Sequence, residues 1–395
     1  CLLHEKPFAG VNGSGKHNNW SMATDAGVNL LTPGDTPFEN AQFLLFLCAV
    51  IKAVDDYQDL LRLSVASAGN DHRLGANEAP PAVVSIFLGD ELMAVLDAIE
   101  NDKTLGAAER TVMKLGAHVL PKFTRDTTDR NRTSPFAFTG NKFEFRMLGS
   151  SNSIAGANIM LNAAVAESLK VYADRLESAT DFETALHDLI KETIKTHKRI
   201  IFNGNGYDDA WIKEATEKRG LLNLRTTPDA LAHFCDEKNV RMLTAHKIFS
   251  KAEIESRYEI NLENYCKTVN IEALTMIDMA KKEILPAVLS YSAELSDTLL
   301  KKKAALPELA CAFESKTVAR LSVLSDEIGK AIEGLEAAVV KYRSVSDVAK
   351  AADLIRDLIL QKMAELRVVC DEAEGLTAKK YWPFPTYSDL LFGVR

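Results

Sequence analysis

Residues 6–21 read KPFAGVNGSGKHNNWS. Three glycines within six positions of this stretch allow the backbone to turn tightly and to approach an anion closely. After the glycines, His17, Asn19 and Ser21 occupy alternate positions, as side chains on one face of an extended strand do. That face would carry an imidazole, an amide and a hydroxyl together. The pattern is typical of a ligand-binding surface rather than of a core.

The same stretch partly fits the phosphate-binding P-loop. Gly10, Gly15 and Lys16 match its pattern up to the last position, which should hold a Ser or Thr that binds magnesium. That position holds His17, and residues 18–21 are a poor first turn of a helix, so the helix amides that hold phosphate would be absent. A P-loop and a plain surface turn remain alternatives to a binding strand.

A second polar strand is predicted at residues 142–146. Lys142, Glu144 and Arg146 alternate there with two phenylalanines, so one face of the strand is charged and the other is apolar. An exposed edge strand that uses charges to discourage pairing is the alternative. A row of positive, negative and positive charge also suits a polar cleft beside a metal ion.

Between these strands, residues 70–81 are rich in Asn, Asp, Gly and Pro and are predicted to form a loop. Loops on rigid scaffolds often carry function, and this one holds Arg73 and Glu78. An exposed turn favoured by Asn and Asp alone is the alternative.

In this order, the motifs resemble those of glutamine synthetases, in particular the type III subfamily. The signature Asn-Gly-Ser-Gly-x-His-x-x-x-Ser ends at Ser21. Arg-Leu, a short gap and Glu-Ala-Pro follow within residues 73–80. An Asn-Arg pair ending at Arg132 then precedes Glu-x-Arg, which begins at Glu144. Residues 379–387, too aromatic and proline-rich for a helix and predicted to dock as an extended arm, look like the type III ending.

This chain departs from the family pattern in two places. The gap between Arg73 and Glu78 is shorter than in the bacterial type I pattern, so the register of the flap differs. Where most synthetases continue with a second phosphate-binding arginine, residues 135–138 read Pro-Phe-Ala-Phe. Arg125 or Arg130 would have to replace that arginine, or it is absent.

The resemblance implies a role for each matching residue. A divalent metal ion, Mg²⁺ or Mn²⁺, would be bound by His17 and Glu144. Glutamate would contact Asn12, Gly13, His17, Arg73 and Arg146. ATP would contact Asn19, Ser21, Arg132 and Lys142. In catalysis, Glu78 would close the flap against water, and Arg132 would neutralise the transferring phosphoryl group.

The implied activity is ligation of ammonia to glutamate with hydrolysis of ATP, through a γ-glutamyl phosphate intermediate. The family implies homo-oligomers built from stacked hexameric rings. Two alternatives stay open: a related ATP-dependent carboxylate-amine ligase, such as one acting on a polyamine, and a non-catalytic, helix-rich assembly protein. The resemblance covers the C-terminal part of such an enzyme without its N-terminal half, so we expect the chain alone to be inactive.

Composition supports a globular protein with more than one core. The chain has 395 residues, 47% of them hydrophobic, and a formal charge of -8, which argues against nucleic-acid or anionic-membrane surfaces. No run of about 18 apolar residues and no leader pattern is visible, so a soluble, unexported protein is expected. The six cysteines are scattered singly, as reduced thiols in a cytoplasmic protein are.

The first part of the chain is predicted to combine strands with helices. Residues 39–65 are predicted to form an apolar helix with Asp55, Asp56 and Asp59 on a solvated face. Residues 82–122 are interpreted as a helical insertion. Two further helices are predicted at 154–176 and 182–198, and the Asn-Gly repeat at 203–207 is interpreted as a plain turn.

From about residue 227 the composition shifts to long charged helices, predicted at 251–305 with a kink or break at Pro286, at 308–345 and at 346–375. In the second helix, apolar residues recur every three or four positions from Leu321 to Val339, as in the seam of a helical bundle. The expected fold class is α+β and mainly α. Residues 1–226 would be the C-terminal part of the guanido-kinase-like catalytic domain, with a few antiparallel strands, and residues 227–395 an antiparallel helical domain with an extended tail.

Overall fold

The computed structural model describes residue 6 and residues 11–34, 37–75, 77–101 and 133–393. The chain divides into two compact units, Cys1–Tyr258 and Glu259–Arg395, and each is described by itself. Both units are mostly helical, and the first contains a small sheet. The described part is therefore α+β and mainly α, as expected. Within that part, no helix combines the length and the apolar character that crossing a membrane would require.

Among the described residues, the sheet of the first unit has four short strands in the order β1-β4-β3-β2. They are β1 (Asn18–Trp20), β2 (Ile86–Phe87), β3 (Phe136–Phe138) and β4 (Phe143–Phe145). β4 pairs antiparallel with β1 and with β3, whereas β2 pairs parallel with β3. The expected antiparallel strands are present, and the edge strand β2 adds a parallel pair that was not expected. A parallel pair needs a long crossover rather than a hairpin, and the connection from β2 to β3 includes the helix α4 (Asp90–Glu100).

One face of the sheet is apolar, as the alternation predicted. Phe136 lies opposite Phe145, and Phe138 lies opposite Phe143, so four buried rings share this face. The centroids of Phe136 and Phe143 are 4.7 Å apart. Phe43, on the helix α1 (Pro37–Asp56), packs against Phe138. The helices thus cover this face, and the opposite face is left to polar side chains.

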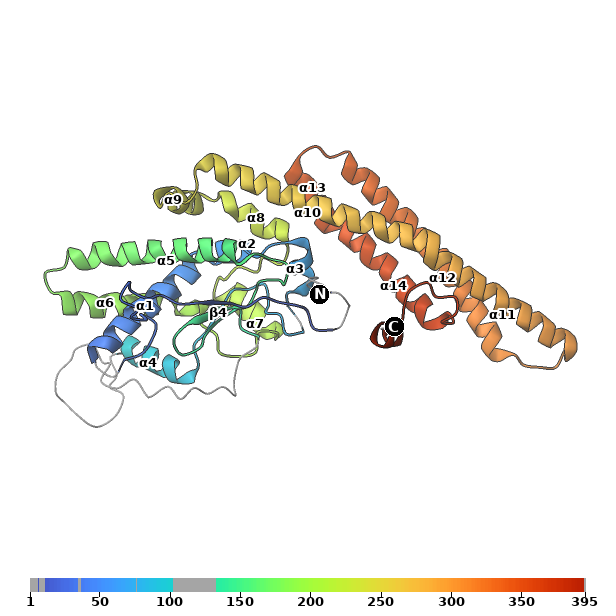
Figure 1. The fold of residues 1–395 in the computed structure, drawn as a ribbon, viewed down its shortest axis with the longest axis horizontal. Helices are drawn as coiled ribbons and strands as arrows, with labels where there is room; N and C mark the ends of the chain where they lie inside the picture. The colour runs from blue at the N-terminus through green and yellow to red at the C-terminus, as the bar shows by residue number, and fades with distance from the viewer. Residues whose placement is uncertain (1–5, 7–10, 35–36, 76, 102–132, 394–395) are drawn as a thin grey trace. The chain divides into compact units, whose positions relative to one another are not determined.

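A second helix, α5 (Ile154–Glu177), also packs on the apolar face (Figure 1). Two of its asparagines, one turn apart, accept hydrogen bonds from β1: Asn158 from the Asn18 amide at 2.7 Å, and Asn162 from the Trp20 indole at 2.8 Å. Because alternate residues of a strand face opposite ways, these bonds direct His17, Asn19 and Ser21 toward the other face.

The apolar helix predicted at 39–65 forms, but it breaks at Tyr57 into α1 and α2 (Gln58–Leu63). The prediction that Asp55 and Asp59 lie on a solvated face is wrong. Asp55 is 2% exposed and Asp59 is fully buried. Each is paired with residues from far along the chain, which the local pattern cannot reveal.

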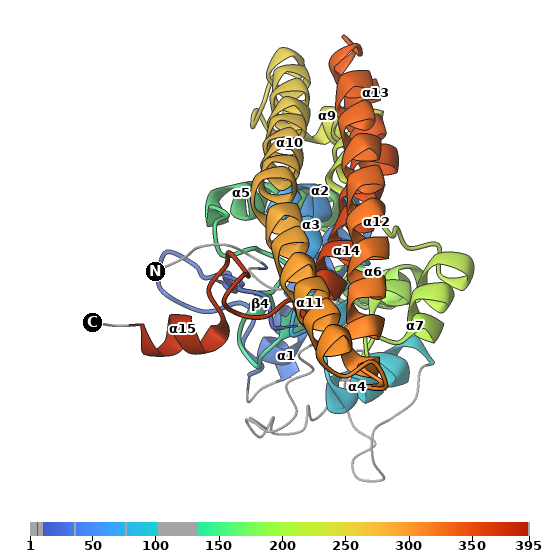
Figure 2. The ribbon, with the colours of Figure 1, turned by 90° about the vertical axis from the view of Figure 1, so that its right-hand side faces the viewer.

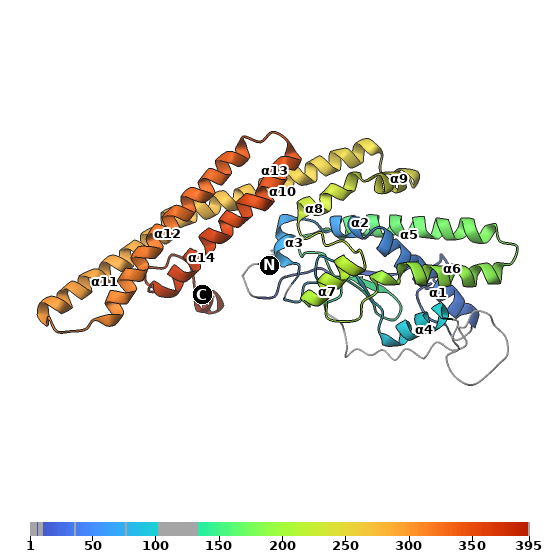
Figure 3. The same cartoon turned by 180° about the vertical axis from the view of Figure 1, so that it is seen from behind.

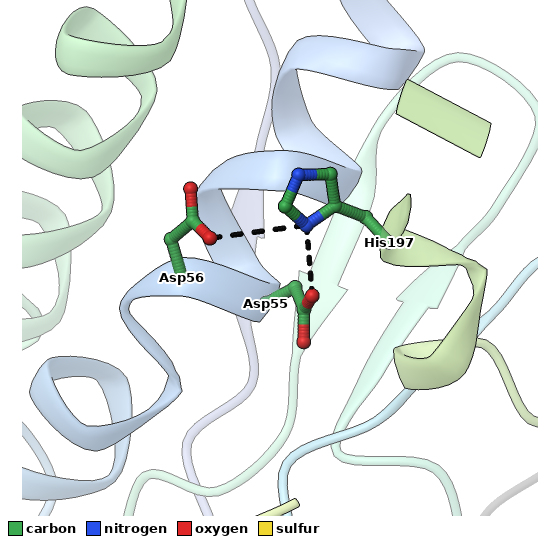
Figure 4. A group of neighbouring side chains, drawn as sticks. All are labelled: Asp55, Asp56 and His197. Atoms are coloured by element: carbon green, nitrogen blue, oxygen red, sulfur yellow. Dashed lines mark hydrogen bonds and ion pairs between the residues drawn. The ribbon is translucent and has the colours of Figure 1, made fainter. Parts of the chain in front are cut away.

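Asp55 accepts a hydrogen bond from His197 Nδ1 at 2.8 Å (Figure 4). It also accepts one from Arg199 Nε at 2.9 Å. His197 ends the helix α6 (Phe182–His197), and a short 3₁₀ helix (Lys198–Ile200) follows it. Asp59 accepts hydrogen bonds from Lys238 and Asn239, both at 2.8 Å. These pairs attach α1 and α2 to the later helices of the first unit.

The segment at 70–81 is also not a loop throughout. Residues Ala68–Arg73 form the helix α3, because the Ser67 hydroxyl caps its first turn by accepting a hydrogen bond from Asn70 N. The remaining helices of this unit are α7 (Asp209–Lys213), a π turn (Glu214–Lys218), α8 (Thr227–Ala232), a 3₁₀ turn (His233–Cys235) and α9 (Glu237–Ala245).

The helix α10 (Lys251–Met279) runs from the first unit into the second. A π turn (Ala280–Ile284) joins it to α11 (Leu285–Ala305), whose second residue is Pro286. Proline lacks an N–H and clashes with the preceding turn, which explains the widened turn at the predicted kink. Then come α12 (Ala312–Arg343), α13 (Val348–Leu354), another π turn (Ile355–Ile359) and α14 (Leu360–Leu376).

The predicted seam of α12 is confirmed. α11 and α12 run beside each other, and α12 also contacts α14 (Figures 2 and 3). The buried seam residues of α12 are Leu321, Leu324, Ile328, Ile332, Leu335 and Val339.

The tail of the second unit is irregular up to Thr386 and contacts α11. Lys380 Nζ lies 2.6 Å from a Glu294 carboxylate oxygen, and the rings of Tyr381 and Tyr291 are 5.7 Å apart. A short helix, α15 (Tyr387–Phe392), then begins behind a capping box formed by Thr386 and Asp389.

Candidate functional site

Three side chains form a row on the polar face of the sheet: His17, Glu144 and Arg146. His17 Nδ1 lies 3.2 Å from Glu144 Oε1, and Arg146 Nε donates to Glu144 Oε2 at 2.8 Å. The antiparallel register brings them together. Asn19 lies opposite Glu144. His17, two residues before Asn19, therefore lies beside Arg146, two residues after Glu144. Residues 127 positions apart in the sequence thus converge as a shared metal ion would require.

The row changes from exposed to buried along its length. The side chain of His17 is 44% exposed, that of Glu144 is 18% exposed and that of Arg146 is 4% exposed. The hydrogen bond to His17, with the hydrogen bond and charge of Arg146, outweighs partial burial, which raises the pKa of Glu144, and lowers this pKa to about 2. Glu144 is therefore an ionised carboxylate at neutral pH, and an imidazole accessible to solvent lies beside it.

This donor pair suits a divalent metal ion, since Mg²⁺ and Mn²⁺ accept carboxylate oxygen and imidazole nitrogen. Such an ion takes about six ligands, and His17 and Glu144 supply two of them. The residues fit the metal as part of a site, and further ligands would have to come from water, substrate or other protein groups.

Two other groups of possible metal ligands occur among the described residues: Asp55, Asp56 and His197, and Asp59, His233 and Asp236. In the first group, Arg199 and Lys52 already pair with the two carboxylates. In the second, Lys238 pairs with Asp59. Lysine and arginine side chains already neutralise these carboxylates, so we interpret both groups as structural ion pairs.

Arg73 connects the three motifs. Its side chain is buried, and it donates to the main-chain oxygens of Arg146 and Met147, both at 3.1 Å. Gly15 of the first motif lies against it: a Cβ added there would be 2.2 Å from an Arg73 nitrogen. Glycine is required at this position because the guanidinium occupies the space a side chain would fill. Arg73 thus fixes the backbone on which Arg146 stands.

The rest of the first motif pairs with the segment after β4. Lys16 N donates to Leu148 O at 3.0 Å, and Ser150 N donates to Ser14 O at 3.2 Å. The chain continues from Lys16 into β1 and not into a helix, which rules out the P-loop geometry. Of the two residues expected to hold glutamate, Asn12 is exposed and Gly13 is half-buried, just before this pairing.

The residues expected near ATP are at the far end of the same strands. Asn19 and Lys142 are exposed. Ser21 is held in place, because its hydroxyl contacts the Asn29 side chain at 3.0 Å and Asn141 O at 2.9 Å. Along this face of the sheet, the described residues expected to bind glutamate therefore lie on one side of Glu144, and those expected to bind ATP lie on the other.

Glu78 lies in a turn that the N–H of Gly75 closes by donating to Pro80 O at 2.9 Å. Asn77 and Glu78 both have positive φ, 55° and 67°, and the Glu78 side chain is exposed. Arg132, with the candidate arginines Arg125 and Arg130 and most of the 82–122 insertion, lies outside the described residues.

Residues 201–207 contribute to the sheet in a way that their sequence does not predict. Ile201 bridges to β2, and Phe202 N donates to Ile86 O at 2.8 Å, so this segment extends the sheet beyond β2. Asn203 then accepts from Leu88 N at 3.1 Å and from Gly89 N at 3.2 Å. The repeated Asn-Gly predicts a turn here. It does not predict that Asn203 binds the backbone at the end of β2.

Comparison with known proteins adds independent evidence. A glutamine synthetase from Butyrivibrio fibrisolvens is 47% identical over 403 residues, which cover 100% of this chain. The chain belongs to the glutamine synthetase family.

Other comparisons agree. A type-3 glutamine synthetase from Dictyostelium discoideum is 43% identical over 99% of the chain, and a glutamine synthetase from Bacteroides fragilis is 41% identical over 99%. The family model described as the glutamine synthetase C-terminal domain matches residues 185–303. The chain spans 54–56% of the length of these glutamine synthetases. The family inferred from the three motifs is thus confirmed.

Proposed function

We propose that this chain supplies the glutamate-binding part and one metal-binding part of a glutamine synthetase active site. The reaction is ATP-dependent ligation of ammonia to glutamate through γ-glutamyl phosphate. The observation that carries the proposal is the convergence of His17, Glu144 and Arg146 on one sheet face, with Glu144 ionised and Arg146 buried behind it.

Each residue of the row has a distinct task. His17 and Glu144 would hold a Mg²⁺ or Mn²⁺ ion, and the bound ion would neutralise charge on the phosphate oxygens. Arg146 binds the substrate carboxylate, together with Asn12 and Gly13. Its geometry is suited to this, because a guanidinium forms two parallel hydrogen bonds to a carboxylate.

The remaining expected residues surround this row. Asn19, Ser21, Lys142 and Arg132 contact ATP, and Arg132 stabilises the charge that spreads over the transferring phosphoryl group. Glu78 attracts ammonium and shields the intermediate from water. Arg73, expected to bind glutamate, also positions Arg146 through its bonds to the backbone.

We further propose that residues 1–226 are part of the catalytic domain, with an insertion at about 82–122, and that residues 227–395 form a type III helical domain. The whole protein would act in the cytoplasm on glutamate, ammonia and ATP, as a homo-oligomer of stacked hexameric rings. If the tests below fail, the chain belongs instead to a non-catalytic assembly protein.

Metal binding is the first test. Titration of the purified chain with Mn²⁺, followed by calorimetry or by the electron paramagnetic resonance of free Mn²⁺, should show one saturable site. Glu144→Gln and His17→Ala should each weaken it at least tenfold, because each removes one of two protein ligands. Lys170→Gln, an exposed change on α5, is the control. Equal affinity in all four proteins would refute the metal assignment.

Activity is the second test. A chimera can be made in which this sequence replaces the matching 56% of the Butyrivibrio fibrisolvens relative. We expect it to form glutamine from glutamate, ammonium and ATP, and Arg146→Lys to raise its KM for glutamate tenfold or more, because a point charge cannot replace the planar fork. A folded chimera that binds Mn²⁺ but forms no glutamine would contradict the proposed activity.

A further inference from the structure

The turn that carries Glu78 has a backbone conformation that needs support. Asn77 and Glu78 follow each other in the left-handed region, where non-glycine residues are uncommon. Such strain, of order 1–3 kcal/mol per residue, persists only where the surrounding structure enforces it. A hydrogen bond from Gly75 N to Pro80 O closes the turn, and the packing of neighbouring segments adds to it.

The segment Asn203–Tyr207 packs against that turn. A Cβ added to Gly206 would lie 3.4 Å from Pro81 Cδ and 2.8 Å from Thr133 O, so a side chain there would touch the first residue and clash with the second. Gly206 N also donates to the Thr133 hydroxyl at 2.7 Å. The segment thus lies between the end of the Glu78 turn and the residue that leads into β3.

Tyr207 reaches the turn more directly. Its hydroxyl oxygen is buried and has no hydrogen-bond partner among the described residues, although its side chain as a whole is only half-buried. Burial raises the pKa of Tyr207, the backbone N–H of Glu78 facing the phenolic oxygen lowers it, the Glu78 charge raises it and the Arg73 charge lowers it. Tyr207 therefore lies beside both flap residues that the family resemblance singled out.

The segment is itself held rigidly. Phe202 stacks on the buried Trp211 with centroids 3.7 Å apart and planes 6° apart, and the Arg219 guanidinium lies 4.9 Å from the Trp211 ring. Arg219 also donates to Ile201 O at 2.8 Å. Together with the Asn203 bonds to the end of β2, this fixes both ends of the segment to the sheet.

We propose that Asn203–Tyr207 is a support for the flap, and that Gly206 and Tyr207 are positioning residues that hold the turn carrying Glu78. The inference rests on the proposed function, because the flap matters for that reaction. When the flap is closed, ammonia attacks the acyl carbon of γ-glutamyl phosphate and phosphate leaves, giving glutamine. When the support is lost, water attacks the same carbon, phosphate leaves and glutamate returns.

Hydrogen exchange tests the support on the purified chain without any activity. The N–H of Gly75 reports closure of the turn. We expect Gly206→Ala to speed its exchange at least tenfold, because the added methyl would clash with Thr133 O and touch Pro81 at the end of the turn. We expect Tyr207→Phe, which removes the buried hydroxyl near the Glu78 backbone and adds no bulk, to speed it severalfold. Ile194→Val, a buried change in α6 away from the segment, is the control for general loss of stability. Unchanged exchange in Gly206→Ala and Tyr207→Phe, or equal acceleration in the control, would overturn the proposal.

Coupling tests the consequence in the chimera described above. The ratio of phosphate released to glutamine formed should be close to one in the parent and should rise at least threefold in Tyr207→Phe and Gly206→Ala, with the KM for ATP unchanged. A purely structural role would lower both products together and leave the ratio at one, which would refute the flap role. A parent chimera without activity would reject the proposed function, and hydrogen exchange would still decide whether the support exists.

Discussion

The polar sheet face of the first unit and the helical seam of the second unit are stabilised in opposite ways. On the sheet, Glu144 and Arg146 are largely or fully withdrawn from water and are paired with each other and with His17. In the second unit, the interior of α12 is apolar, and ion pairs such as Arg320–Glu372 are on the surface. Withdrawing charged groups from water costs free energy. A row of buried charged side chains is therefore typical of a ligand-binding or catalytic site.

The comparison predicts that the largest single effect on stability comes from the seam. Leu324→Ala should lower the free energy of unfolding of the second unit by about 2–5 kcal/mol, because it removes a fully buried side chain and leaves a cavity. Urea unfolding followed by circular dichroism measures this. Val323→Ala, at an exposed neighbouring position, should change it little. Equal losses in both would mean that packing does not hold this unit.

A glycine substitution should have opposite signs in the two regions. Gly15→Ala should destabilise the first unit by about 1–3 kcal/mol, because the methyl would displace Arg73, whose far end is fixed by bonds to Arg146 O and Met147 O. Gly329→Ala in α12 meets no atom within 4 Å and should stabilise by about 0.5–1 kcal/mol through helix propensity. Thermal unfolding of both variants checks the contrast, and the same sign in both would break it.

The two regions also differ in how much of them the sequence predicts. The apolar residues of α12 recur every three or four positions, and this spacing predicts which of them are buried, because they lie on one face of the same helix. The strand at 143–145 was equally predictable from alternation. Asp55 and Asp59 were not, since their partners His197, Arg199, Lys238 and Asn239 are 142–180 residues away.

For the candidate site, the motifs gave the residues but not their arrangement. Resemblance identified His17, Glu144, Arg73 and Arg146, and folding adds that Arg73 is bound to the backbone beside Arg146. The support at 203–207 had no sequence signal beyond turn residues, because its function arises from tertiary contacts. A one-residue difference in register would leave its composition unchanged but would misplace every contact.

Acid should affect the first region in a defined pH range. The folded-state pKa of Glu144 is lowered from 4.5 to about 2, so its contribution to stability is present above pH 4.5 and is lost as the pH falls toward 2. Charged hydrogen bonds of about 1.5–3 kcal/mol, reduced by partial exposure, suggest about 1 kcal/mol in total. Unfolding free energy measured at pH 5, 4 and 3 should fall less steeply in Glu144→Gln than in the parent. Parallel curves would show that this carboxylate does not contribute.

The smallest expected effect is at Arg320, and it is the sharpest test of the contrast. Its guanidinium makes two hydrogen bonds to the two oxygens of Glu372, both at 2.6 Å, whereas Nε and Nη2 of Arg146 both lie 2.8 Å from one oxygen of Glu144. The side chains of Arg320 and Glu372 are 37% and 44% exposed, whereas that of Arg146 is 4% exposed. Water and salt screen the attraction between two exposed charges. Ordering two long side chains also costs entropy, so the ion pair adds almost nothing to the free energy of unfolding. Arg320→Gln should therefore leave the unfolding midpoint of the second unit unchanged within error, both at low salt and at 1 M NaCl. A clear loss at low salt that disappears at high salt would mean that surface charge stabilises this unit after all, and that burial does not by itself separate the two regions.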